Sequence, residues 1–193
     1  MDNKMIFNLN IESIINKALK MWSMVKRICK SVNGALFLKL YKTYILPLLE
    51  YCNVLHVINK TQMAKIESVQ RQITRYICNK MNIFYKNYNH RLEILKLKSI
   101  EMRRILKILT LIHKIKNDKY NILYNLKYRF NFIETRNGTK IVKPYNRVNF
   151  CDRSFAIYSI DLYNTLLNEV RCEEKLSPFL SKCEKYFKFI AIV

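Results

Sequence analysis

The chain has 193 residues, of which 50% are hydrophobic, enough for a globular core, which argues against disorder throughout. Its 35 Lys and Arg residues against 14 Asp and Glu residues give a formal net charge of +21, which favours polyanionic partners, nucleic acid first. Codon bias toward Lys, Asn, Ile and Tyr is an alternative source of the lysines, and under that reading the charge is incidental to function.

The six cysteines do not follow a zinc-binding pattern, because no C-x-x-C pair occurs. Cys52 and His56 could share a helical face, but two weak ligands favour core packing over a metal site. The residues around Asp2 and Lys4 lack the apolar stretch of a signal peptide. We therefore expect reduced thiols in an intracellular protein, nuclear or cytoplasmic and not secreted. No uncharged run is long enough to cross a membrane, and we expect no metal, no cofactor and no membrane partner.

Apolar residues recur at helical spacing over residues 10–32, which predicts a first helix there. Asn33 and Gly34 follow it, and Gly34 is placed as its C-terminal cap. A second helix is predicted over 35–52. Pro47 should kink or divide this helix, because proline removes a backbone donor and clashes with the preceding turn.

A third helix is predicted over residues 61–80. Lys65, Arg71 and Arg75 fall on its polar side, together with Gln72 and Asn79. The apolar stripe on the opposite side consists of Met63, Ile66, Val69 (or Gln70), Ile73 and Ile77.

A short helix is expected over 91–95, and a long one over 99–116, opened by Ser99. In the long helix a basic stripe occupies roughly 60° of the circumference at about 100° per residue. Leucine and isoleucine side chains occupy the other positions and are expected to face inward. The stripe consists of Arg103, Lys107, Thr110 and Lys114, and the inward set includes Leu106, Leu109 and Ile112.

Helical periodicity fails between residues 128 and 150, where Asn137-Gly138 predicts a small hairpin or an ordered loop. Helices return over 154–167 and 178–189. The expected class is mainly α with at most one small β-hairpin. A helical bundle is expected over 1–80, and a further helical region over 81–193.

Four segments, in this order, resemble the C-terminal part of the reverse transcriptase of jockey-like non-LTR retrotransposons (LINEs). NKALKMWSMVKRI at 16–28 is similar to the helix that this family places after its polymerase palm. LYKTYILPLLEY at 40–51 is similar to the family run LYxSLVRPxLEY, and IESVQRQITR at 66–75 to LExVQRRFTR. RLEILKLKSIEMRR at 91–104 is similar to RLxxLxLxSLExRR. A fainter similarity covers 150–166 and 177–187.

The resemblance implies that 1–80 is a thumb, the subdomain that grips the template–primer duplex, and that 81–193 is the post-thumb region. It also implies RNA or DNA as the partner, met through phosphate contacts. An alternative is that Arg71 or Arg103 pairs with a carboxylate such as Glu67 or Glu101. The expected phosphate contacts are Lys65, Arg71, Arg75, Arg103, Arg104 and Lys107.

The chain also departs from the family. His56 stands where the family has Trp, Leu46 where it has Arg, and no Tyr-x-Asp-Asp occurs to hold the metal ions of polymerisation. We therefore expect a non-catalytic, truncated piece of a reverse transcriptase. Two alternatives stay open: an RNA-directed DNA polymerase by homology, or a helical interaction protein whose basic charge is incidental.

Overall fold

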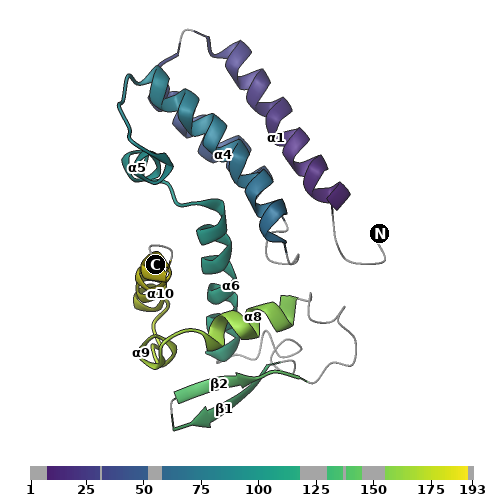
Figure 1. Cartoon of the computed structure of the whole chain (residues 1–193), viewed down its shortest axis with the longest axis vertical. Coiled ribbons are helices and arrows are strands. Elements are labelled where there is room, and N and C mark those ends of the chain that lie inside the picture. The colour runs from purple at the N-terminus through teal and green to yellow at the C-terminus, as the bar shows by residue number, and fades with distance from the viewer. Residues whose placement is uncertain are drawn as a thin grey trace. The chain divides into compact units, whose positions relative to one another are not determined.

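The computed structural model describes residues 8–30, 32–51, 58–117, 130–136, 138–144 and 155–190 (Figure 1). Within these ranges the chain is mainly helical, with one two-stranded antiparallel sheet. This confirms the predicted mainly α class with one small hairpin. Chain contacts divide the described residues into two compact units, the first ending at Arg103 and the second beginning at Arg104.

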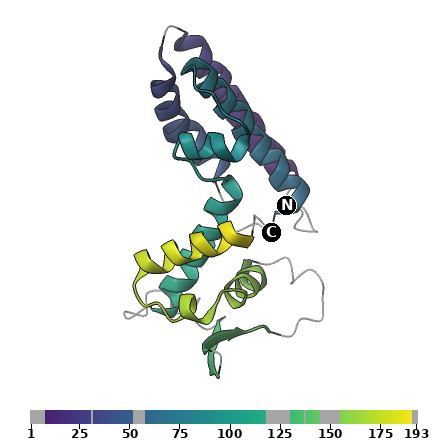
Figure 2. The same cartoon turned by 60° about the vertical axis from the view of Figure 1, so that its left-hand side comes forward.

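The first unit is entirely helical in its described part. Helices α1 and α4 lie side by side along most of their length (Figures 1 and 2). The elements are α1 (Asn8–Ile28), α2 (Gly34–Leu40), the π-helical turn η1 (Tyr41–Ile45), α3 (Leu46–Leu49), α4 (Lys60–Lys80), α5 (Tyr88–Ile94) and the beginning of α6 (Ile100–Lys116).

An apolar core joins these helices, and the stripe predicted on the third helix is part of it. Every member of that stripe is buried on α4, including Gln70. Trp22 of α1, Phe37 of α2 and Tyr76 of α4 meet edge to face, with ring centroids 5.3–5.8 Å apart. Edge-to-face packing places the positive rim of one ring against the negative face of the next.

The sequence predicted that Gly34 is a C-terminal cap, and this prediction is wrong. Helix α1 ends at Ile28, and Gly34 is the first residue of α2, whose N-cap is Asn33. The Asn33 Oδ1 atom accepts a hydrogen bond of 3.1 Å from the Leu36 N–H. A side chain at position 34 would meet Met81 and the carbonyl oxygen of Ile77 in the last turn of α4. Close approach of another helix, rather than a left-handed backbone, explains this glycine.

Pro47 divides the second helix as predicted. It lies near the start of α3, and the wide turn η1 precedes it. Proline has no N–H to donate to the carbonyl oxygen one turn earlier. In the preceding turn the backbone hydrogen bond spans five residues instead of four, from the Leu46 N–H to the Tyr41 carbonyl.

The second unit contains the rest of α6, the hairpin β1 (Asn131–Thr135) and β2 (Gly138–Val142), α8 (Phe155–Asn164), α9 (Asn168–Arg171) and α10 (Leu176–Ile190). The hairpin packs against α8 through β2 (Figure 1). The core of this unit consists of Ile108, Leu109, Ile112, Ile115, Phe130, Ile141, Ile160, Tyr163, Leu166, Val170, Phe179 and Cys183.

The boundary between the units differs from the predicted one after residue 80. Helix α5 belongs with α4, because Arg91 donates hydrogen bonds to Thr74 and to the Arg71 carbonyl.

In the hairpin, Thr135 pairs with Gly138, which is the first residue of β2 and has a φ of 86°. Position 137 lies outside the described residues. Cys52 and His56 also lie outside them. None of the helices in the described ranges combines the length and the apolar composition that crossing a membrane requires.

Candidate nucleic-acid interface

The outward face of α4 carries cations and neutral hydrogen-bonding side chains. Lys65, Arg71 and Arg75 are all exposed on it, as predicted. The single carboxylate of α4, Glu67, is buried at the edge of this face, one helical turn before Arg71, whose charge lowers its pKa. Phosphate oxygens accept hydrogen bonds from cationic and neutral donors, and a face without carboxylates does not repel them. The exposed neutral members of this face are Thr61, Ser68, Gln72 and Asn79.

The three predicted phosphate contacts of α4 differ in how they are held. The Lys65 Nζ atom lies 3.9 Å from the Glu12 carboxylate, and both side chains are more than half exposed, so this contact is weak. The Arg71 guanidinium lies 4.9 Å from the centre of the Tyr88 ring, which fixes its direction while leaving it exposed. Arg75 is exposed and forms no ion pair within the residues that the structure describes.

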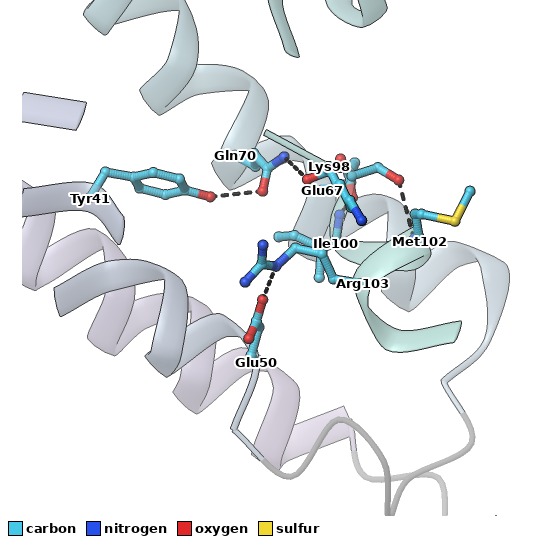
Figure 3. A network of polar contacts seen from close by, with 9 residues as sticks. Tyr41, Glu50, Glu67, Gln70, Lys98, Ile100, Met102 and Arg103 are labelled. Atoms are coloured by element: carbon cyan, nitrogen blue, oxygen red, sulfur yellow. Dashed lines mark hydrogen bonds and ion pairs between the residues drawn. The ribbon is translucent and has the colours of Figure 1, made fainter. Parts of the chain in front are cut away.

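Two predicted phosphate contacts, Arg103 and Arg104, are not available on an open basic face. Arg103 forms an ion pair with Glu50, whose side chain is only 9% exposed (Figure 3). Arg104 is buried at 3% exposure, with its guanidinium 5.4 Å from the centre of the Tyr158 ring. Helical spacing directed both residues outward, but Glu50 engages Arg103, which stays partly exposed, and Tyr158 packs beside the buried Arg104. Lys107 is exposed on α6, in the second unit.

A second group of cations, missed by the sequence analysis, lies on α1. Lys17, Lys20 and Arg27 line an open hollow of about 840 Å³ that no carboxylate lines. None of the three forms an ion pair in the part of the chain that the structure describes. Their spacing along one helical face was the signal that could have identified them.

Beneath the α4 face, Glu67 joins three segments of the first unit. Its Oε2 atom accepts a hydrogen bond of 3.0 Å from the Ile100 N–H at the start of α6, and its Oε1 atom accepts one from the Tyr88 hydroxyl. Burial raises the pKa of the Glu67 carboxyl, and the Tyr88 and Ile100 hydrogen bonds oppose that increase. Burial and the adjacent Glu67 raise the pKa of Tyr88, which keeps its hydroxyl a donor.

Gln70 connects two further segments through both ends of its amide (Figure 3). The Oε1 atom accepts a hydrogen bond of 2.7 Å from the Tyr41 hydroxyl, and the Nε2 atom donates one of 3.0 Å to the Lys98 carbonyl. Gln70 and Tyr41 are both fully buried, so each hydrogen bond satisfies a group that water cannot reach.

Arg91 completes the network as a buried cation. Its Nε atom donates to the Thr74 hydroxyl at 3.0 Å, and its guanidinium lies 4.8 Å and 5.2 Å from the ring centres of Tyr85 and Tyr88. The polar residues that carry the family resemblance therefore hold the first unit together.

Comparisons with known proteins give one relevant similarity. Over 121 residues the chain is 31% identical to an uncharacterized protein of Caenorhabditis elegans. The aligned part is 62% of this chain and 61% of that relative, so the chain spans less than two thirds of the relative's length. No protein-family model and no solved structure matches the chain.

The described residues offer cations and hydrogen-bond donors but no metal-binding group. No set of three or more His, Cys, Asp and Glu side chains among them could hold a metal ion. In the second unit, Glu173 and Lys182 form an ion pair of 2.6 Å beside an open hollow that includes Cys172. The chemistry that the α1 and α4 faces can perform is electrostatic binding of an anionic polymer.

Proposed function

We propose that this chain is a non-catalytic helical piece of a non-LTR retrotransposon reverse transcriptase that contacts the backbone of RNA or DNA. The observation that supports this proposal is the outward face of α4, which carries Lys65, Arg71 and Arg75 and no carboxylate. Arg71 and Arg75 stand one helical turn apart, about 6 Å along the axis. Neutralising phosphates releases their counterions, which gives affinity without base recognition.

The proposal places no catalysis in this chain. Template-directed polymerisation requires carboxylates that hold two metal ions in an open site. In the first unit, Glu50 is engaged by Arg103 and Glu67 by Tyr88 and the start of α6. Both carboxylates thus serve the packing of helices. RNA-directed DNA polymerase is the activity of the family that the sequence resembles, and it would need residues outside those described here.

The test is a salt titration of binding to a duplex of RNA and DNA. For the wild type, the logarithm of the affinity should fall linearly as the logarithm of the salt concentration rises. Arg75→Ala should flatten that plot by about one unit, because it removes one phosphate contact. Lys185→Ala is the matched control, since it removes an exposed cation of the second unit outside the proposed face.

Two outcomes would contradict the proposal. Equal slopes for Arg75→Ala and the wild type, with the helical circular dichroism spectrum unchanged, would remove α4 from the binding face. Equal losses for Arg75→Ala and Lys185→Ala would show that only total charge matters, as expected for a helical interaction protein with incidental basic charge.

A further inference from the structure

The two outer edges of the β1–β2 hairpin differ in the hydrogen bonds that they form with the rest of the second unit. On the β2 edge, the Asn164 side-chain amide accepts from the Ile141 N–H at 3.0 Å and donates to the Ile141 carbonyl at 2.9 Å. A guanidinium nitrogen of Arg171 donates to the Thr139 carbonyl at 2.9 Å. Side chains thus occupy the hydrogen-bonding positions that a third strand would use, and they close this edge.

Among the residues that the structure describes, none closes the β1 edge. Since Thr139 and Ile141 direct their backbone groups away from β1, the alternation of an antiparallel ladder makes Gly138, Lys140 and Val142 the residues bonded to β1. In β1 the outward groups therefore belong to Phe132 and Glu134. No hydrogen bond reaches those groups from any residue in the ranges that the structure describes.

We propose that β1 pairs with β1 of a second copy of this chain, antiparallel and about a two-fold axis through Ile133. In this register Phe132 of one copy exchanges both backbone hydrogen bonds with Glu134 of the other, and the reverse pair does the same. The two hairpins then form one four-stranded sheet whose outermost strands are the closed β2 edges. No open edge is left, so pairing stops at two copies.

The side chains of β1 are self-complementary in this register. Ile133, which is 42% exposed, comes opposite Ile133 of the second copy, at a Cβ–Cβ distance of about 4.5–5.5 Å. Asn131 comes opposite Thr135, and Phe132 opposite Glu134, so no two like charges face each other. On the β2 side of the same face, Lys140 comes opposite Ile133, and Val142, which is 39% exposed, lies diagonal to it. Because the side chains of β1 are compatible with those of another β1 strand in this register, we choose a second copy of the chain over an unrelated strand as the partner.

Charge sets the conditions under which the pairing is observed. Two chains of formal charge +21 repel each other, and the five-residue strand gives a small interface. The association should therefore be reversible, and it should strengthen as salt screens the repulsion. Nucleic-acid binding weakens with salt, so this dimer and the proposed function respond in opposite directions and can fail separately.

The first experiment is sedimentation velocity of the full chain, freed of nucleic acid, over a range of protein and salt concentrations. The wild type should shift from monomer toward dimer as either concentration rises. Glu134→Pro should stay monomeric, because it removes an outward N–H while leaving the hairpin ladder intact. Glu134→Ala, which keeps the N–H, should associate like the wild type.

The second experiment locates the two-fold axis by disulfide trapping in a Cys172→Ser background, since Cys172 is an exposed thiol. Ile133→Cys should form a covalent dimer on mild oxidation, because the two Ile133 positions face each other. Asn131→Cys and Thr135→Cys should cross-link when mixed and not when oxidised singly. A monomer at every concentration, a dimer that Glu134→Pro leaves intact, or equal trapping at all three positions would each overturn the proposal.

Discussion

The Oε2 atom of Glu67, in the middle of α4, accepts a hydrogen bond of 3.0 Å from the Ile100 N–H, which opens α6. A carboxylate from one helix therefore caps the N-terminus of another, where the first N–H groups lack partners and the helix dipole favours an anion. This contact ties the beginning of α6 to the first unit.

Glu67→Ala should destabilise the first unit by about 1–3 kcal/mol, because it leaves the Tyr88 hydroxyl and the Ile100 N–H without their acceptor. Urea unfolding followed by circular dichroism measures the change. Glu101→Ala, an exposed carboxylate in the first turn of α6, is the control and should change stability by less than about 0.5 kcal/mol. A loss for Glu67→Ala no larger than that of the control would contradict the capping role.

Arg103→Ala should cost about 1–3 kcal/mol of folding stability, since the Glu50 carboxylate is 9% exposed and would lose its cation. Its plot of affinity against salt should keep the wild-type slope, because the guanidinium is engaged by Glu50 rather than by phosphate. Arg75→Ala is the converse case, with stability nearly unchanged and a flatter slope. If Arg103→Ala instead flattens the slope without loss of stability, the phosphate contact that the sequence suggested is real.

Gly34→Ala should destabilise the chain although alanine is the better helix former. A Cβ atom at position 34 would lie 2.1 Å from Met81 Cγ and 3.1 Å from both the Ile77 carbonyl oxygen and the Met81 nitrogen. Displacing these atoms should cost about 1–3 kcal/mol, more than the gain of about 1 kcal/mol in helix propensity. The double variant Gly34→Ala/Met81→Ala should lose less than the sum of the single losses, because the nearest clash is gone. Additive losses would show that Met81 does not set the cost.

Acid should weaken the second unit through His113. Burial lowers the pKa of this imidazole below 6.5, and the hydrogen bond of its Nε2 atom with the Glu173 carbonyl, at 3.1 Å, only partly opposes that. A lowered folded pKa means that the folded state favours neutral His113. Its contribution to stability is complete above about pH 6.5 and is lost as the pH falls through the folded pKa. As the pH is lowered from 7.5 to 6.5 and 5.5, the urea concentration at the unfolding midpoint should therefore fall more steeply for the wild type than for His113→Gln. Parallel pH profiles would exclude His113 as the titrating group.

Local sequence patterns gave most of the secondary structure. The spacing of Ile66, Ile73 and Ile77 predicted the buried side of α4, because a helix repeats every 3.6 residues whatever surrounds it. Pro47 divided its helix, and a hairpin formed where periodicity failed. Gly34 was placed wrongly, since the feature that requires glycine there is the end of α4, some forty residues later in the chain.

The composition by itself determined a mainly helical, strongly basic chain, and the pattern of α4 determined which of its cations face outward. Only the tertiary structure decided which cations are available. Arg75 is open, Arg103 is engaged by Glu50, and Arg104 is buried beside Tyr158. Helical periodicity gives the direction of a side chain from its own helix, but its partner comes from a distant segment. The availability of a charge is therefore a property of the fold.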